Sequence, residues 1–330
     1  MDLSTLVLTR SEVRGLLDYR TCIDAVEEAF RAESSNRTLP ALVLATHVAG
    51  GGFHVKTAGM RGDRFYYATK TNGNFPGNPA SNGLPTIQGV LSLHDADNGR
   101  LLALMDSMEL TMIRTAAASA VAAKYLARAD SRTVTILGCG IQGRSQLRAL
   151  SHVRSIEEVF AYDFNEDIAR EYSMGMAAEL DCTVTAVKDY HDAVRASDVI
   201  ITCTPSREPL LRSGDIRPGA FIAAVGADSE HKSEIAPDLL AASKVVVDAL
   251  EQCATIGDLH HAIEAGVMRR ENVHADLADV VNDTKPGRRS DEEIIIFDST
   301  GTALEDVAAA AVVYELAIER DAGIRVDLGA

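Results

Sequence analysis

The chain has 330 residues, which is long enough for two domains, and its 46% hydrophobic and 24% charged residues are ordinary for a soluble globular protein. A formal net charge of −16 disfavours nucleic acid and anionic membranes as partners, because both are negatively charged. The amino terminus has no basic start followed by a long apolar run, so no signal peptide is expected, and the longest apolar stretches are too short to span a bilayer.

The first hundred residues predict a mixed domain dominated by sequential strands. Leu6–Leu8 is expected to be a short strand, Thr9–Glu12 to begin a helix with Ser11 as its candidate cap, and Tyr19–Ser34 to form an amphipathic helix. Strand-like segments separated by turn signals follow, and they favour a mostly antiparallel sheet. They are Ala41–Val48, Gly52–Thr57, Arg64–Thr71, Thr86–His94 and Arg100–Met105.

A segment rich in Gly, Asn and Pro lies between Lys70 and Thr86. A loop this long in a compact domain is usually functional or disordered, and the bulky residues Phe75 and Leu84 favour an ordered functional loop. Glu109–Ala127 then predicts a long, alanine-rich helix that leads into the next unit.

The middle of the chain has the order of elements that binds a dinucleotide. The β-branched strand Thr133–Leu137 runs into Gly138–Gly143, which has the spacing G-x-G-x-x-G, and Gln142–Leu150 is helical in pattern. A second strand, Glu158–Tyr162, ends at Asp163, twenty residues after Gly143. In this context the turn is strong evidence for a nucleotide site, against the alternative of an ordinary glycine turn in an α/β sheet.

Each part of this unit has a physical role in that prediction. Gly138 permits the tight turn, Gly140 lets the backbone approach the pyrophosphate, and Gly143 packs the helix on the strand. The helix N-terminus offers N–H groups and a positive dipole end to the phosphates. Asp163 would accept hydrogen bonds from the adenosine ribose and repel a 2′-phosphate, which favours NAD and leaves NADP open.

Alternating strands and helices continue after Asp163 and predict a Rossmann-type, doubly wound parallel sheet. A last helix, Leu304–Ile318, could fold back on the first domain and make it discontinuous. The expected domains are 1–115 with 304–330, an α+β substrate domain, and 116–303, a dinucleotide-binding domain. The further elements expected are Asn165–Ala178, Thr183–Val187, Ala193–Ala196, Asp198–Thr202, Ala220–Val225, Ser233–Leu240, Lys244–Val247 and Ile294–Phe297.

Ligands of open α/β sheets bind beyond the carboxyl ends of the strands, and three loops qualify: Cys203–Pro205, Val225–Asp228 and Asp298–Gly301. Their small residues would let a nicotinamide ring approach, although any one of them could be a plain turn. Asp228 is the best candidate for a general acid or base, with a helix cap for Ser233–Leu240 as the rival interpretation. His231 could replace Asp228 as the proton carrier.

Two cations stand in apolar surroundings. Lys70 ends an apolar strand, and Arg114 lies in a helix of small residues. A buried cation needs a partner, and a bound carboxylate would serve, since Arg is suited to bidentate carboxylate binding. The alternative for each is a salt bridge within the protein.

The five cysteines are scattered, odd in number and form no C-x-x-C pair. We expect them to be reduced, small apolar residues of a cytoplasmic protein. The pattern predicts neither a zinc site nor a thiol nucleophile, and no metal is expected.

The sequence resembles the ornithine cyclodeaminase/μ-crystallin family in stretches that cover most of the chain. The Gly226–Asp228 loop fits as well. The matching stretches are Lys70-Thr-Asn-Gly-Asn-Phe-Pro-Gly-Asn-Pro with Gly83-Leu-Pro, Leu110-Thr-Met-Ile-Arg114-Thr115-Ala-Ala, Gly138-Cys-Gly-Ile-Gln-Gly143, and Ser299-Thr-Gly301 with Glu305-Asp306.

The resemblance implies a nucleotide-binding domain and a second domain that dimerises. Members bind NAD or NADP and act on amino acids or cyclic imino acids, as cyclodeaminases, amino-acid dehydrogenases or ketimine reductases, and μ-crystallins also serve as lens or hormone-binding proteins. Lys70 and Arg114 match positions that hold the substrate carboxylate, and Asp228 matches the catalytic acid. Positions around the cofactor are matched by Thr86, Thr115, Gln142, Asp163, Thr204, Val225, Lys232 and Ser299. The predicted cofactor site further includes Gly138, Gly140, Ile141, Gly143, Pro205 and Gly226.

The chain departs from the ornithine-specific pattern at two places. Near Lys56 the cyclodeaminase pattern has a glutamate facing the distal ammonium of ornithine, which a lysine would repel. An arginine expected shortly after Pro40 is absent. Lys56 could replace that arginine or bind a second acidic group.

The sequence therefore predicts an NAD(P)-dependent oxidoreductase acting on the C–N bond of a small amino or imino acid, and a homodimer. Lys70 and Arg114, with Lys56, would hold the carboxylate, and Asp228 would handle the proton. The alternatives are ornithine cyclodeaminase itself and a non-catalytic, μ-crystallin-like binding protein.

Overall fold

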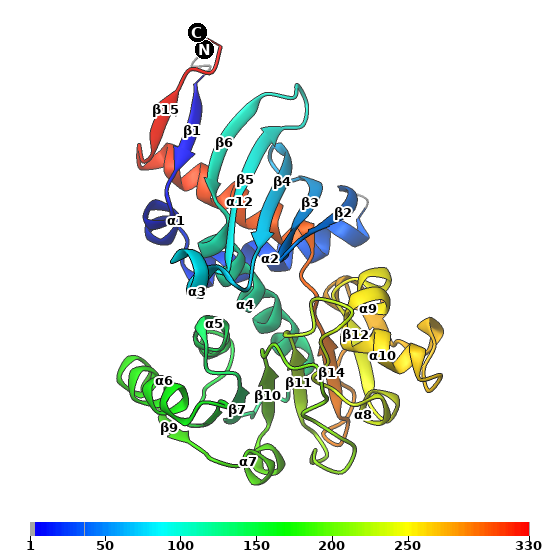
Figure 1. The fold of residues 1–330 in the computed structure, drawn as a ribbon. Coiled ribbons are helices and arrows are strands. Elements are labelled where there is room, and N and C mark those ends of the chain that lie inside the picture. Colours follow the sequence, from blue (N-terminus) through cyan, green and yellow to red (C-terminus); the bar gives the residue numbers. More distant parts are fainter. Residues whose placement is uncertain (1–3, 36, 330) are drawn as a thin grey trace. The chain divides into compact units, whose positions relative to one another are not determined.

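The computed structural model describes residues 4–35 and 37–329. The chain forms two compact units, Met1–Thr115 with Thr302–Ala330, and Ala116–Gly301 (Figure 1). The first unit is therefore discontinuous in sequence. Its assignment to substrate binding and dimerisation stays a prediction.

The first unit is built on a seven-stranded sheet in the order β15-β1-β6-β5-β4-β3-β2. Only β1 and β6 pair in parallel, so the mostly antiparallel sheet expected from the sequence is confirmed. The strands are β1 (Thr5–Leu8), β2 (Thr38–Val48), β3 (Gly51–Arg61), β4 (Phe65–Asn74), β5 (Ile87–Asp95), β6 (Leu101–Asp106) and β15 (Ile324–Val326).

Helix α12 (Ala303–Glu319) packs on β3 and β4 and against α2 (Tyr19–Ser34), so the C-terminal helix does fold back on the first unit (Figure 1). Helix α2 buries its predicted apolar face, including Phe30. The cap predicted for the first helix is corrected: Thr9, not Ser11, caps α1 (Arg10–Leu16), because Thr9 and Glu12 form a reciprocal capping box. The remaining helices that begin in this unit are α3 (Asn78–Asn82) and α4 (Ser107–Leu126).

The second unit has an eight-stranded parallel sheet in the order β13-β12-β14-β11-β10-β7-β8-β9. The chain leaves β7 toward β8 and β9 and later returns to build the other half from β10, so a topological switch point lies between β7 and β10. The strands are β7 (Thr133–Leu137), β8 (Glu158–Tyr162), β9 (Thr183–Ala186), β10 (Val199–Thr202), β11 (Phe221–Ala224), β12 (Lys244–Val247), β13 (Ala275–Asp276) and β14 (Ile295–Asp298).

Short helices connect the later strands of this sheet (Figure 1). The helix predicted over Ser233–Leu240 is wrong in extent: only Pro237–Ala241 is helical, because Ile235 is held extended by a parallel bridge to Leu211 and Pro237 starts the helix. The helices are α5 (Ile141–Ser151), α6 (Glu166–Glu179), α7 (His191–Ala196), α8 (Pro237–Ala241), α9 (Leu250–Ile256), α10 (Asp258–Glu264) and α11 (Leu277–Val281), with a 3-10 turn at Arg270–Asn272.

The segment predicted as a loop between Lys70 and Thr86 is ordered, and part of it is regular. Strand β4 continues to Asn74, and α3 occupies its middle. The backbone N–H of Phe75 donates to the carbonyl of Thr86 at 2.8 Å and closes the segment.

No helix in the described parts of the chain is both long and apolar enough to cross a membrane. The five cysteines are unpaired, and burial raises the pKa of Cys139 to about 12.

Candidate active site

Lys70 and Arg114 meet two carboxylates of α12 in the interior of the first unit. Lys70 Nζ lies 2.7 Å from Asp306 Oδ2, and it donates to Thr111 Oγ1 at 3.3 Å. Arg114 donates from Nε to Asp306 Oδ1 at 2.8 Å and from Nη1 to Glu305 Oε2 at 2.9 Å. All four charged side chains are at most 5% exposed. The salt bridge weighed as an alternative from the sequence is thus present for both cations.

Local structure explains why the acids lie there. Thr302 caps α12 and forms a capping box with Glu305, which places both acids in the first turn of the helix. Strand β3 puts Lys56 directly opposite Lys70 on β4. Lys56, Lys70 and Arg114 therefore come from two strands and a helix, and the charge of Lys56 acts on both Lys70 and Asp306.

The pKa values reflect this crowding. The pKa of Lys70 is lowered to about 7, first by burial and then by the charges of Arg114 and Lys56, while Asp306 opposes the shift. Burial also lowers the pKa of Arg114, but Asp306 and Glu305 outweigh burial and the net shift is upward. Burial raises the pKa of Asp306, yet Lys70 and Arg114 hold it below its ordinary value.

The glycine turn has the geometry that its three roles require. Gly138 has φ +103°, a conformation that L-residues with a side chain rarely adopt. A Cβ on Gly143 would lie 2.1 Å from the carbonyl oxygen of Gly138, so α5 can pack on β7 only with glycine there. A Cβ on Gly140, the N-cap of α5, would meet nothing within 4 Å. The open position is the one expected to face a pyrophosphate.

Neighbours of the turn fit the same interpretation. Gln142 Nε2 is a buried donor with no hydrogen-bond partner among the described residues. Ile141, at the first helical position, is 74% exposed. Asp163 Oδ2 accepts from the backbone N–H of Cys139 at 2.9 Å, so the acid after β8 also fixes the glycine turn.

The loops after β10 and β11 are joined by Glu234, a residue that the sequence analysis did not select. Glu234 is fully buried. Its Oε1 accepts from the backbone N–H and the hydroxyl of Thr204 at 2.6 and 2.7 Å, and its Oε2 accepts from Thr202 Oγ1 at 2.7 Å and the Gly226 N–H at 2.8 Å. The backbone N–H of Val225 donates to the carbonyl of Thr202, which continues the pairing of β10 with β11.

Asp228 is a solvent-accessible acid, with 57% of its side chain exposed. Lys232 Nζ donates to its Oδ1 at 2.5 Å. The rival interpretation of Asp228 as a helix cap is wrong, because α8 begins after Ala236, eight residues later. His231 is 70% exposed and lies 3.5 Å from Glu230.

The loop after β14 is organised by a second buried acid. Asp248 Oδ2 accepts from the backbone N–H groups of Thr300 and Gly301 at 2.7 and 2.6 Å and from Ser299 Oγ at 3.2 Å. Of three further cofactor candidates, Thr115 lies in a helix and Pro205 in a loop, as expected, whereas Thr86, expected to begin a strand, lies one residue before β5.

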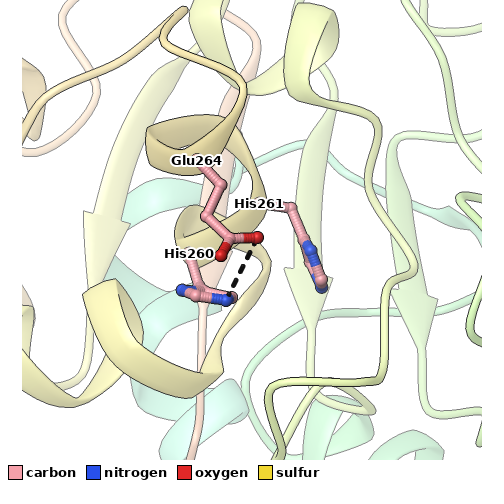
Figure 2. A group of neighbouring side chains, drawn as sticks. All are labelled: His260, His261 and Glu264. Carbon is pink, nitrogen blue, oxygen red and sulfur yellow. Dashed lines mark ion pairs between the residues drawn. The ribbon is translucent and has the colours of Figure 1, made fainter.

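Helix α10 carries His260, His261 and Glu264, the one group in the described chain with potential metal ligands in mutual reach. Figure 2 shows His260 paired with Glu264, at 3.5 Å, and His261 alongside. His261 Nε2 lies 2.8 Å from the carbonyl oxygen of Lys232, so this imidazole anchors the segment that follows Asp228.

The residues missed by sequence analysis share one property. Glu234 and Asp248, which the sequence analysis did not select, and Asp306, to which it gave no role, are buried acids that each have a partner 30 or more positions away in the chain. The signal that selected Arg114, a lone charge among small residues, applies equally to Asp306 in the alanine-rich α12 and would have found it.

The chain is similar over nearly its whole length to known proteins of one family. The family described as "Ornithine cyclodeaminase/mu-crystallin family" matches residues 3–321. The alanine dehydrogenase of Archaeoglobus fulgidus is 38% identical over 329 residues, 98% of this chain and 98% of that protein. A solved archaeal alanine dehydrogenase dimer with bound NAD has a TM-score of 0.94 at 38% identity, over 98% of this chain and 99% of that one. The Thermococcus litoralis Delta(1)-pyrroline-2-carboxylate reductase, in complex with NADH and L-proline, has a TM-score of 0.93 at 34% identity, over 98% and 100%.

Proposed function

The chain belongs to the ornithine cyclodeaminase/mu-crystallin family, and from this premise we propose that it is an NAD-dependent oxidoreductase acting on the C–N bond of a small amino acid or cyclic imino acid. The relatives described above are a dehydrogenase of an amino acid and a reductase of a cyclic imino acid, and two solved structures hold NAD or NADH. The observation that carries the proposal is the glycine turn, with its open Gly140 and the unpartnered amide of Gln142.

In the second unit, the N-terminus of α5 would bind the pyrophosphate through its backbone N–H groups. Gln142 would donate its Nε2 hydrogens there, and Asp163 would accept from the adenosine ribose. The acid disfavours a 2′-phosphate, which supports NAD over NADP. The nicotinamide supplies the chemistry of hydride acceptance or donation when the cofactor is bound.

In the first unit, Lys70 and Arg114 would bind the substrate carboxylate. A guanidinium has five N–H donors, so Arg114 can hold Glu305 and Asp306 and still donate to a further carboxylate. The positive charge of Lys56, opposite Lys70, disfavours the distal ammonium of ornithine.

Asp228 would take or return the proton of the substrate nitrogen or of water. Its exposure leaves it accessible to a ligand, and Lys232 keeps a cation beside its carboxylate. A general acid or base must come within hydrogen-bond reach of the proton it moves, and an exposed loop acid can do so.

We further propose that the protein is a cytoplasmic homodimer. Strand β2 forms an edge of the first sheet and exposes an apolar run, with Leu42 and Leu44 each 62% exposed and Val43 47%. A long, apolar edge strand is normally paired or covered, and a second copy of the same unit is the simplest cover. One solved relative is described as a dimer, and unpaired cysteines fit a reducing compartment.

The decisive experiment is a screen of amino acids with NAD and NADP, and of cyclic imines or keto acids plus ammonia with NADH and NADPH, followed at the nicotinamide absorbance. We expect NAD(H)-dependent turnover of at least one pair. Ammonia release from ornithine without net NADH formation would select the cyclodeaminase alternative instead. If no substrate turns over while NADH binds, and an Asp228→Ala variant binds NADH equally well, the μ-crystallin-like binding protein is favoured.

A further inference from the structure

Glu234 has a complete set of hydrogen-bond donors around its buried carboxylate. Each oxygen accepts two bonds, and the donors are two hydroxyls and two backbone N–H groups. Backbone N–H groups cannot act as acceptors, so Thr204 and Gly226 require an acceptor at both oxygens. Burial raises the pKa of Glu234, and the hydrogen bonds from Thr204, Thr202 and Gly226 oppose that rise.

The glutamate is itself fixed to the core of the second unit. The backbone N–H groups of Glu234 and Ile235 donate to Asp258 Oδ1 at 2.7 and 3.0 Å. The backbone N–H of Leu259, one residue on, donates to Asp298 Oδ2 at 2.9 Å at the end of β14. The carboxylate of Glu234 is therefore held by the sheet and α10, and does not move freely with the loops that it contacts.

The bond from Gly226 to Glu234 closes the loop that carries Asp228. Gly226 begins this loop and Glu234 ends it, so the acid and Lys232 lie on a segment whose two ends are joined. The approach is close, because a Cβ on Gly226 would lie 2.5 Å from Glu234 Cδ. Near its end, the carbonyl oxygen of Lys232 lies 2.8 Å from His261 Nε2.

We propose that Glu234 is a positioning residue for the reaction. Its carboxylate holds the loop after β10 and the loop after β11, which carries Asp228, at fixed positions relative to each other at the carboxyl ends of the strands. This inference rests on the proposed function. Ligands of such sheets bind at this edge, so the relation that Glu234 imposes decides where the cofactor and the proton-transferring acid lie.

A matched control exists at the opposite end of the same strands. Asp198 directly precedes β10 and is also buried, and it accepts from the backbone N–H groups of Arg132 and Thr133 at 2.8 and 3.0 Å. It joins the amino ends of β7 and β10, as Glu234 joins loops at the carboxyl ends. Asp198 also pairs with Arg128 and Arg217, so Asp198→Asn removes a buried and hydrogen-bonded carboxylate at the other end of the strands from the proposed site.

The test compares full-length Glu234→Gln, Glu234→Asp and Asp198→Asn with the wild type. We would measure the NADH Kd by fluorescence, kcat and KM with the substrate pair found in the screen, and Tm by circular dichroism. Because a glutamine offers one acceptor oxygen in place of two, Glu234→Gln is expected to weaken NADH binding or lower kcat at least tenfold. Asp198→Asn is expected to lower Tm to a similar degree and to keep Kd and kcat within about twofold.

Equal Kd and kcat for Glu234→Gln and Asp198→Asn, at a temperature where both are folded, would overturn the proposal. If Glu234→Gln does not fold, the same comparison is made with Glu234→Asp, which keeps the charge but shortens the side chain. Wild-type values in that variant would overturn the proposal, and a tenfold loss would support it. A wild-type protein that binds NADH without turnover refutes the proposed function, while the NADH Kd still tests Glu234.

Discussion

Lys70 and Asp306 form a buried ion pair, 2.7 Å from Nζ to Oδ2, although 236 residues separate them in the chain. The pair connects a central strand of the first sheet to the C-terminal helix. Arg114 shares the same carboxylate, so neither cation is an isolated charge. A pre-paired cluster of this kind holds its donors in fixed orientations before a ligand arrives, which favours binding of a planar carboxylate.

Replacing Arg114 by alanine should affect substrate binding and stability but spare the cofactor. We expect kcat/KM for the amino or imino acid to fall at least a hundredfold, because the guanidinium would be lost from the carboxylate site. The free energy of unfolding should fall by about 3–5 kcal/mol, since the buried carboxylates of Glu305 and Asp306 would both lose the hydrogen bonds from Arg114. Steady-state kinetics and denaturant unfolding measure both effects. Unchanged kcat/KM at saturating cofactor would refute the carboxylate assignment, and Arg114→Lys serves as the charge-conserving control.

The pH dependence of substrate capture should report Lys70. The pKa of Lys70 is lowered to about 7, and the ammonium form is the one that binds a carboxylate, so kcat/KM should fall as the pH rises through about 7. Bound carboxylate favours the ammonium, so kcat should show the same fall at a higher pH. A Lys70→Arg variant stays charged and should lose this limb of the profile, even if its activity is lower. A wild-type profile that is flat from pH 6 to 9 would contradict the prediction.

The same shift has a consequence for stability with a definite sign. Between pH 7 and the ordinary value of 10.5, the unfolded chain binds a proton at Lys70 that the folded protein has released. The contribution of Lys70 to the free energy of unfolding should therefore increase with pH in this window. The urea unfolding midpoints of the wild type and of Lys70→Met, compared at pH 7 and pH 9.5, isolate this contribution of Lys70.

Two glycine variants should separate folding from cofactor binding. Gly143→Ala places a methyl group 2.1 Å from the Gly138 carbonyl oxygen and should lower Tm substantially. Gly140→Ala adds a methyl group in open space at a φ of −74° and should leave Tm within about 2 °C. It should nevertheless weaken NADH binding at least tenfold, because the methyl group would occupy the path of the pyrophosphate. Normal NADH affinity in Gly140→Ala would place the nucleotide elsewhere.

Asp163 should set the preference between the two nicotinamide cofactors. In Asp163→Asn the amide oxygen can still accept from the Cys139 N–H, but the charge that opposes a 2′-phosphate is gone. We expect the ratio of NADPH to NADH affinity to rise about tenfold. Parallel fluorescence titrations with the two cofactors give this ratio, and no change in it would exclude Asp163 from the ribose site.

The apolar edge strand predicts the oligomeric state. Leu44→Lys should shift the protein from dimer to monomer in light scattering coupled to gel filtration, because a charge would be buried at the interface of the two copies. Met174→Lys, at a 77% exposed position of the second unit, is the control and should remain dimeric. A wild-type monomer would refute the proposed dimer.

Local periodicity predicted much of the fold. Helix α2 and strands β7, β8 and β12 have the bounds expected from the sequence, because apolar spacing and turn residues within each segment define them. The helix over Ser233–Leu240 was wrong because a partner strand, absent from local sequence, holds Ile235 extended. Helices α9 and α10 were not predicted, because they are short and because packing stabilises them more than their own sequence pattern does.

The candidate site was predicted unevenly for the same physical reason. The glycine turn is contiguous in sequence, so its spacing reveals its role directly. Lys70 and Arg114 were recognised as charges in apolar surroundings, but their partners on α12 could not be paired with them without the fold. Glu234 escaped notice because its role consists of hydrogen bonds to backbone groups that come together only when the sheet forms.

The split of the first unit between the two ends of the chain bears on how the protein is made. Ala116–Gly301 is one uninterrupted stretch of the chain, so the second unit can fold without either segment of the first unit. Lys70 and Arg114 are translated well before Asp306, which lies 236 and 192 positions further along the chain. Until α12 is made, Lys70 and Arg114 lack the acids that pair with them in the folded first unit. A messenger truncated before codon 305 would therefore yield a product with an intact second unit and a first unit that cannot fold completely.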